Sequence, residues 1–188
     1  MRRLVIACAL LGPLVAGCDE RKSADTAPPP QTMTAAAIGT YCGMSLIEHA
    51  GPKGQILLAS RPDPLWFSSA RDAIAFTLLP EEAKDIRAVY VSDMAKAPSW
   101  EHPGPDNWVL AEDAVFVIDS DARGDMGAEE AVPFSDRAAA AEFAARRAGR
   151  LATLSEIPRT YVLGSGEAAR IEPEMESPAH KHAPTGTH

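Results

Sequence analysis

The chain has 188 residues, of which 46% are hydrophobic and 23% charged, and its formal net charge at pH 7 is -8. A chain this acidic lacks the basic stripe that displaces counterions from phosphates, so its composition argues against nucleic acid as a partner. The charge favours instead a cationic small ligand or a basic protein surface.

The first 17 residues read as a secretory signal. An apolar run from Leu4 to Gly17 is too short to span a bilayer but suits the hydrophobic part of a signal peptide. The run ends in the sequence VAGC at 15–18, which resembles a bacterial lipobox, so we expect cleavage before Cys18 and lipidation of that cysteine. Asp19 is similar to the residue that retains such lipoproteins at the inner membrane of some Gram-negative bacteria.

Cleavage decides which cysteine keeps its thiol. Cys8 leaves with the signal and Cys18 carries the lipid, so Cys42 is the only free thiol expected in the mature chain. The same cleavage removes Arg2 and Arg3, which changes the formal charge from -8 to -10. In an oxidising compartment an unpaired thiol is either buried as a small hydrophobic side chain or retained for its chemistry.

Both ends of the mature chain are expected to be unstructured. Residues 18–37 are polar and contain prolines without apolar periodicity, so they read as the lipidated cysteine followed by a flexible tether. Residues 167–188 are rich in Pro, Glu and His and read as a disordered tail, in which His180 and His182 are weaker metal candidates.

The residues between these ends are predicted to form two units, at 38–97 and 98–166, each with the order β-β-α-β. The first has expected strands at 41–47, 55–59 and 88–94 and a helix capped by Ser68 or Ser69; the second has strands at 114–120, 129–134 and 150–154 and a helix capped by Ser135 and stopped by Gly149. Units of about 60 residues bury modest cores, so we expect the two to pack together. The predicted fold is α+β, built from tandem duplicated units.

A possible metal site lies in the stretch YCGMSLI. If these residues form a strand, Cys42 and Met44 project from one face and their sulfurs converge on one ion. A thiolate and a thioether are soft donors, which select Cu(I) over harder divalent ions. One thiolate and one Cu(I) sum to zero charge, which suits a partly dry pocket. Structural zinc fits poorly, because its sites use four Cys or His ligands at characteristic spacings.

Three further side chains are candidate ligands. Met126 lies in the acidic turn GDMG, where it is either a copper ligand or docking residue or an incidental loop methionine. Met94 ends a predicted strand and is either a ligand or a core side chain. His49 precedes a Gly-Pro turn and either caps the copper site, holds a second, harder metal ion through its imidazole, or is an exposed turn histidine.

Together these motifs resemble the NosL family, the copper-binding accessory lipoproteins of nitrous oxide reductase. The resemblance covers nearly the whole folded part, in the blocks CGM, HAGPKGQI, WFSSARDAIAF, AVYVSDM, WEHP, GDMGAEEAVPF and IPRTYVL. Cys42 and Met44 match the family's Cys-x-Met copper motif, Met126 matches the methionine of its Gly-x-Met-Gly turn, and His49 matches its nearby histidine.

The resemblance implies a duplicated β-β-α-β protein, distantly similar in fold to organomercurial lyase, that is not an enzyme. It implies a carrier of Cu(I), lipid-anchored at the periplasmic face of the inner membrane, whose partners are nitrous oxide reductase and its inner-membrane assembly complex. Two alternatives remain. Carbon–mercury cleavage is disfavoured because its expected site has paired cysteines. A metal-free scaffold lipoprotein would leave Cys42 merely buried and would function normally with Cys42→Ser.

Overall fold

The computed structural model describes residues 27–164. The expected signal peptide, the predicted lipidation site at Cys18, and the candidate ligands His180 and His182 lie outside these residues. The strands are β1 (Gly54–Leu58), β2 (Leu65–Phe67), β3 (Ile86–Ser92), β4 (Trp108–Leu110), β5 (Val115–Ile118), β6 (Val132–Phe134) and β7 (Arg150–Thr153). The helices are α1 (Ala70–Leu78), α2 (Arg137–Arg146) and α3 (Arg159–Leu163), with single 3₁₀ turns η1 (Leu46–Glu48) and η2 (Leu154–Glu156).

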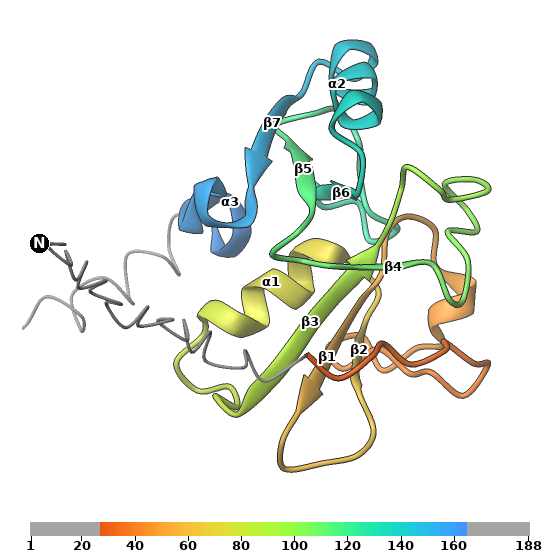
Figure 1. The fold of residues 1–188 in the computed structure, drawn as a ribbon, viewed down its shortest axis with the longest axis vertical. Coiled ribbons are helices and arrows are strands. Elements are labelled where there is room, and N and C mark those ends of the chain that lie inside the picture. The colour runs from red at the N-terminus through yellow and green to blue at the C-terminus, as the bar shows by residue number, and fades with distance from the viewer. Residues whose placement is uncertain (1–26, 165–188) are drawn as a thin grey trace, which may run out of the picture.

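The strands form two antiparallel sheets, which confirms a mixed α and β fold. The first has the order β2-β1-β3-β4 and the second the order β6-β5-β7 (Figure 1). Apart from β4, which joins the first sheet, the chain follows the order β-β-α-β twice, and in each unit the first strand pairs with the second and the third. The hairpin of the first unit is formed by β1 and β2 and not by the predicted strands at 41–47 and 55–59, and the sequence pattern predicts neither β2 nor β4. A common origin of the two units by duplication stays a prediction.

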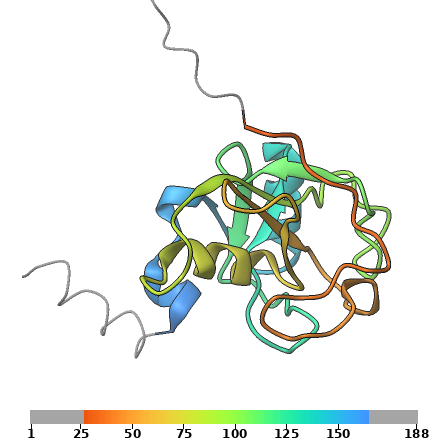
Figure 2. The same ribbon diagram turned by 90° about the horizontal axis from the view of Figure 1, so that it is seen from below.

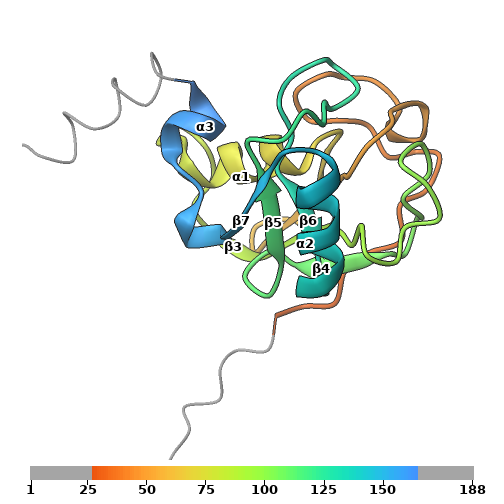
Figure 3. The same ribbon diagram turned by 90° about the horizontal axis from the view of Figure 1, so that it is seen from above.

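Helix α1 lies between the two sheets, as Figures 1 and 3 show. The largest hydrophobic cluster includes Ile74 of α1, Val91 of β3, Phe116 of β5 and Ala152 of β7. Helix α3 closes this cluster through Val162. The two units therefore share one core, as expected for units too small to be stable alone.

Polar side chains cap the two long helices. The Ser69 side chain accepts a hydrogen bond from the backbone N–H of Asp72, which confirms the predicted cap of α1. Helix α2 is capped by Asp136 rather than by the predicted Ser135. The Ser135 hydroxyl instead donates to the buried carboxylate of Asp93 at 2.5 Å, so it is not free to cap the helix.

The segment that precedes the first unit packs on the first sheet. Gln31 exchanges hydrogen bonds with the side chain of Gln55, and the Tyr90 hydroxyl donates to the Pro28 carbonyl at 2.9 Å. Figure 2 shows this segment running along one edge of the molecule. We expected a flexible tether up to residue 37, so these contacts place the start of the packed chain earlier. Within residues 27–164 no helix is both long and apolar enough to cross a bilayer.

Candidate metal centre

The thiol lies in a compact loop, and the prediction of a strand at 41–47 is wrong. An isolated bridge between Ile38 and Ser45 closes the loop, and inside it the Gly39 N–H donates to the Met44 carbonyl at 2.9 Å. Gly43 has a φ of 68°, which a continuous strand cannot accommodate. The positions of Cys42 and Met44 are therefore set by this turn and not by the alternation of a strand.

The thiol of Cys42 faces an imidazole. Its Sγ lies 4.0 Å from Nε2 of His49, which follows the 3₁₀ turn η1 at the end of the loop. Cys42 is partly exposed, whereas the His49 side chain is only 5% exposed. This corrects the reading of His49 as an exposed turn histidine and places a second donor atom beside the sulfur.

Asp125 orients the imidazole. Its Oδ2 lies 2.7 Å from Nδ1 of His49, and this hydrogen bond lowers the pKa of the Asp125 carboxyl. An Nδ1–H that donates to the carboxylate leaves the lone pair of His49 at Nε2, on the side of Cys42. Metal-binding histidines are commonly held in this way, with a carboxylate behind the ring. Sequence reasoning missed Asp125, although it had singled out the acidic turn that contains it.

The same contact brings the predicted Met126 turn to the Cys42 loop. Figures 2 and 3 show the two loops side by side, although 76 residues separate His49 from Asp125. Met44 is 40% exposed and Met126 is 64% exposed, so both thioethers are accessible. Met94 packs instead against the hydrophobic cluster under α2, as its alternative reading as a core side chain predicted.

The buried ammonium group of Lys53 stabilises the turn that follows His49. Lys53 is 1% exposed, and its Nζ donates to the carbonyl oxygens of Ala50 and Gly51 at 2.9 and 2.7 Å. Burial lowers its pKa to about 8, against the opposing effect of Glu130 and other nearby anionic groups. Lys53 thus fixes the turn that follows His49. The sequence predicts only a turn in this segment.

A buried carboxylate supports the second loop. Oε1 of Glu130 accepts hydrogen bonds from the Ser69 hydroxyl and from the backbone N–H groups of Arg71 and Ala131. Its Oε2 is buried and has no hydrogen-bond partner within residues 27–164. Burial therefore raises the pKa of Glu130 to about 7. The carboxylate joins the Met126 loop of the second unit to the start of α1 in the first.

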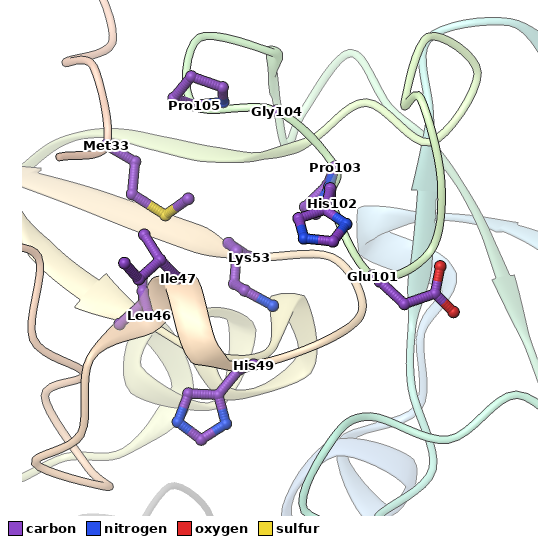
Figure 4. A pocket seen from close by; sticks show the side chains of 10 residues that line it. All are labelled: Met33, Leu46, Ile47, His49, Lys53, Glu101, His102, Pro103, Gly104 and Pro105. Carbon is purple, nitrogen blue, oxygen red and sulfur yellow. The ribbon is translucent and has the colours of Figure 1, made fainter. Parts of the chain in front are cut away.

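An open cavity of about 220 Å³ adjoins the site. The side chains of Leu46, Ile47 and His49 form one wall, Lys53 lies between the walls, and residues 101–105 face them (Figure 4). Met33 of the packed N-terminal segment also lines it. His49 therefore lines this cavity and also faces the thiol of Cys42.

The donor set of this centre is soft. In the part of the chain that the structure describes, no three His, Cys, Asp or Glu side chains are grouped to hold a metal ion. Beside Cys42 the structure places His49 as a nitrogen donor, and the exposed thioethers of Met44 and Met126 lie on the two loops that meet there. A thiolate with thioethers and one imidazole suits Cu(I) better than zinc or calcium.

The NosL family model matches residues 30–162, which include both loops of this centre. The chain belongs to the NosL family. It is 43% identical over 164 residues to the copper-binding lipoprotein NosL of Achromobacter cycloclastes, covering 87% of this chain and 83% of that protein. It is 28% identical over 172 residues to the copper-binding lipoprotein NosL of Stutzerimonas stutzeri, covering 92% and 85%.

The fold agrees with that of a solved NosL protein. The crystal structure of the copper chaperone NosL from Shewanella denitrificans superimposes with a TM-score of 0.65 at 32% identity. The match covers 71% of this chain and 99% of that one. The relatives named as copper-binding lipoproteins or as a copper chaperone therefore match this chain over most of its length.

Proposed function

We propose that this protein carries Cu(I) on Cys42 and Met44 and delivers it for the maturation of nitrous oxide reductase. The observation that carries the proposal is the position of His49, whose Nε2 lies 4.0 Å from the thiol while its Nδ1 is held by Asp125. One contact thus gathers the thiol, an oriented imidazole and the loop of Met126. The relatives named as copper-binding and as a copper chaperone support the same chemistry.

The exposure of the thioethers suits a carrier better than a permanent copper site. Met44 and Met126 reach solvent, so an incoming donor approaches the ion without the protein unfolding. Thioethers are weak, neutral donors, and each can leave as a donor of the acceptor arrives. Copper then passes by ligand exchange with no change in its oxidation state, which is a transfer and not an enzymatic reaction.

The lipid anchor belongs to the same proposal. Both curated relatives are named lipoproteins, and the lipobox predicts attachment through Cys18. Several acyl chains hold a protein stably at a membrane, since each buried methylene contributes roughly 0.8 kcal/mol. Anchoring at the periplasmic face of the inner membrane raises the concentration of the carrier near a membrane assembly complex that matures the reductase.

A Cu(I) titration against a competing chelator under anaerobic conditions tests the proposal. Wild type is compared with Cys42→Ser, Met44→Leu and Met126→Leu, and Met94→Leu serves as the matched control because its side chain packs against the hydrophobic cluster under α2. We expect the Cys42 and Met44 variants to lose tight binding and the control to retain it.

The Met126 variant separates two roles for that residue. Weakened Cu(I) binding makes Met126 a ligand, whereas unchanged binding makes it a docking residue. Tight Cu(I) binding by Cys42→Ser contradicts the proposed site. Absence of Cu(I) binding by the reduced wild type favours the metal-free scaffold lipoprotein.

A further inference from the structure

Within the described residues, the large apolar side chains with high exposure lie on the two loops that meet at His49. In residues 27–164 the large hydrophobic side chains with high exposure are Ile38, Tyr41, Met44, Ile47 and Met126. The first four lie within ten residues around the thiol, and the fifth lies on the loop that reaches His49. We call these five residues the apolar rim. Copper binding explains the two methionines, and the Tyr41 ring packs edge-on against Phe67, but neither explains the exposure of Ile38 and Ile47.

The cavity that His49 lines adjoins this surface. Ile47 belongs both to the apolar rim and to the cavity wall, and Pro103 and Pro105 lie opposite it (Figure 4). The cavity is open and lined mostly by apolar groups, so it can receive an aliphatic side chain from another molecule. Exposed apolar surface next to a pocket is typical of a protein-binding site.

The charge around the apolar rim is negative. Residues 38–52 and 124–130 contain no Lys or Arg, and Lys53, the next basic residue, is buried. Glu48 and Asp125 lie beside rim residues, and Glu82 accepts a hydrogen bond from the Tyr41 hydroxyl at 3.1 Å. Arg123, directly before the second loop, donates to the carbonyl oxygens of Ser120 and Ala122 and is paired with Glu129, so this cation is offset by a carboxylate of the same loop.

The negative charge around the apolar rim determines which kinds of molecule can bind there. A second copy of the chain would bring carboxylates against carboxylates, and an anionic lipid surface would be repelled. A protein surface with an apolar centre and surrounding Lys or Arg side chains is complementary to the apolar rim.

We propose that the apolar rim and its cavity are the docking surface for the copper acceptor, a protein that presents an aliphatic side chain surrounded by basic residues. The inference rests on the proposed function, because it takes the copper at Cys42 as the cargo. Docking here places the donors of the acceptor next to the thiol, and copper moves without release into solvent.

Replacement of the chromosomal gene by variants tests the inference in cells that make nitrous oxide reductase. The variants are Ile47→Ser, which removes an exposed rim side chain, and Glu48→Lys, which reverses a rim charge. Glu112→Lys makes the same change in net charge at an exposed position away from the rim and is the control. The copper content of the reductase is measured after a short induction, and the Cu(I) affinity of each purified variant is measured separately.

We expect both rim variants to lower the copper content of the reductase by about tenfold while binding Cu(I) as wild type does. Glu112→Lys should load the reductase normally. Full loading by the rim variants, or equal loss with Glu112→Lys, overturns the docking surface. Weakened Cu(I) binding by the rim variants also overturns it, because these residues would then act on the metal site.

Two further outcomes would show that either the proposed partner or the proposed function is wrong. A wild-type dimer that Ile47→Ser dissociates, seen by sedimentation, would make a second copy the occupant of the apolar rim. If deletion of the gene leaves the copper content of the reductase unchanged, the proposed function itself is wrong, and the docking surface falls with it.

Discussion

Gly39 provides the space that the thiol occupies. A β-carbon at this position would lie 2.4 Å from Sγ of Cys42, so Gly39→Ala must push the thiol into another rotamer. We expect this variant to bind Cu(I) about tenfold more weakly, because the sulfur no longer faces His49, with a stability change of about 1 kcal/mol or less. Chelator competition and urea unfolding measure the two effects.

Gly43→Ala is the contrasting variant. Its β-carbon would meet no atom within 4 Å, but its φ of 68° disfavours any residue with a side chain. We therefore expect a loss of stability of about 1 kcal/mol from backbone strain.

Wild-type Cu(I) affinity in Gly39→Ala would show that the position of the thiol beside the imidazole does not matter for binding.

Glu130 predicts a pH dependence of stability. Its pKa is raised from 4.5 to about 7 in the folded protein, so between these values the folded state binds more protons than the unfolded state. The stabilisation that comes from this extra proton binding is complete below the pKa of Glu130 in the unfolded chain. It is lost as the pH rises through the pKa of Glu130 in the folded protein. Relative to Glu130→Gln, wild type should lose roughly 3 kcal/mol over this window.

Urea unfolding of both proteins at about pH 5 and about pH 8 measures the difference. The Gln variant removes the titration but keeps the volume of the side chain in the buried site. Equal slopes of stability against pH in the two proteins would mean that the carboxyl titrates normally in the fold.

At the scale of single elements, Asp136 stabilises helix α2. Its carboxylate accepts a hydrogen bond from the Ala139 N–H at 2.7 Å, at the start of an exposed, alanine-rich helix. Asp136→Ala should cost about 1 kcal/mol of stability. The control is Glu142→Ala, which removes an exposed ion pair with Arg146 and should cost about 0.5 kcal/mol or less. A loss from Asp136→Ala no larger than that from the control would mean that the cap contributes little.

Elements with a strong local pattern could be predicted from the sequence. The serine before α1 and the continuous apolar run of β5 are such patterns, and both elements lie where they were expected. The cap of α2 was misplaced because Ser135 bonds to Asp93, 42 residues away. The Cys42 loop was misread as a strand because its turn depends on the conformation of Gly43 and on one isolated bridge.

At the scale of the whole molecule, Phe116 tests whether the two units form one cooperative structure. Its side chain is fully buried in the cluster that joins α1, β3, β5 and β7. Phe116→Ala should cost about 3–5 kcal/mol, and because the core is shared, both units should unfold in one transition. Hydrogen exchange that shows the first sheet protected after the second has opened would contradict the shared core.

The candidate site is assembled from both units of the fold, so only part of it could be predicted from the sequence. The soft donors Cys42 and Met44 could be identified from residue types at close spacing. The contact between His49 and Asp125 could not, because it requires the two units to be packed against each other. Lys53 was likewise missed, since nothing in its local sequence indicates that its ammonium group is buried.

The most direct test of the account is X-ray absorption at the copper edge of the purified protein loaded with Cu(I). The account predicts monovalent copper bound mainly by sulfur, with fewer sulfur ligands in Met44→Leu and loss of the bound copper in Cys42→Ser. Copper bound only by nitrogen and oxygen, or sulfur coordination that survives the loss of Cys42, would contradict it.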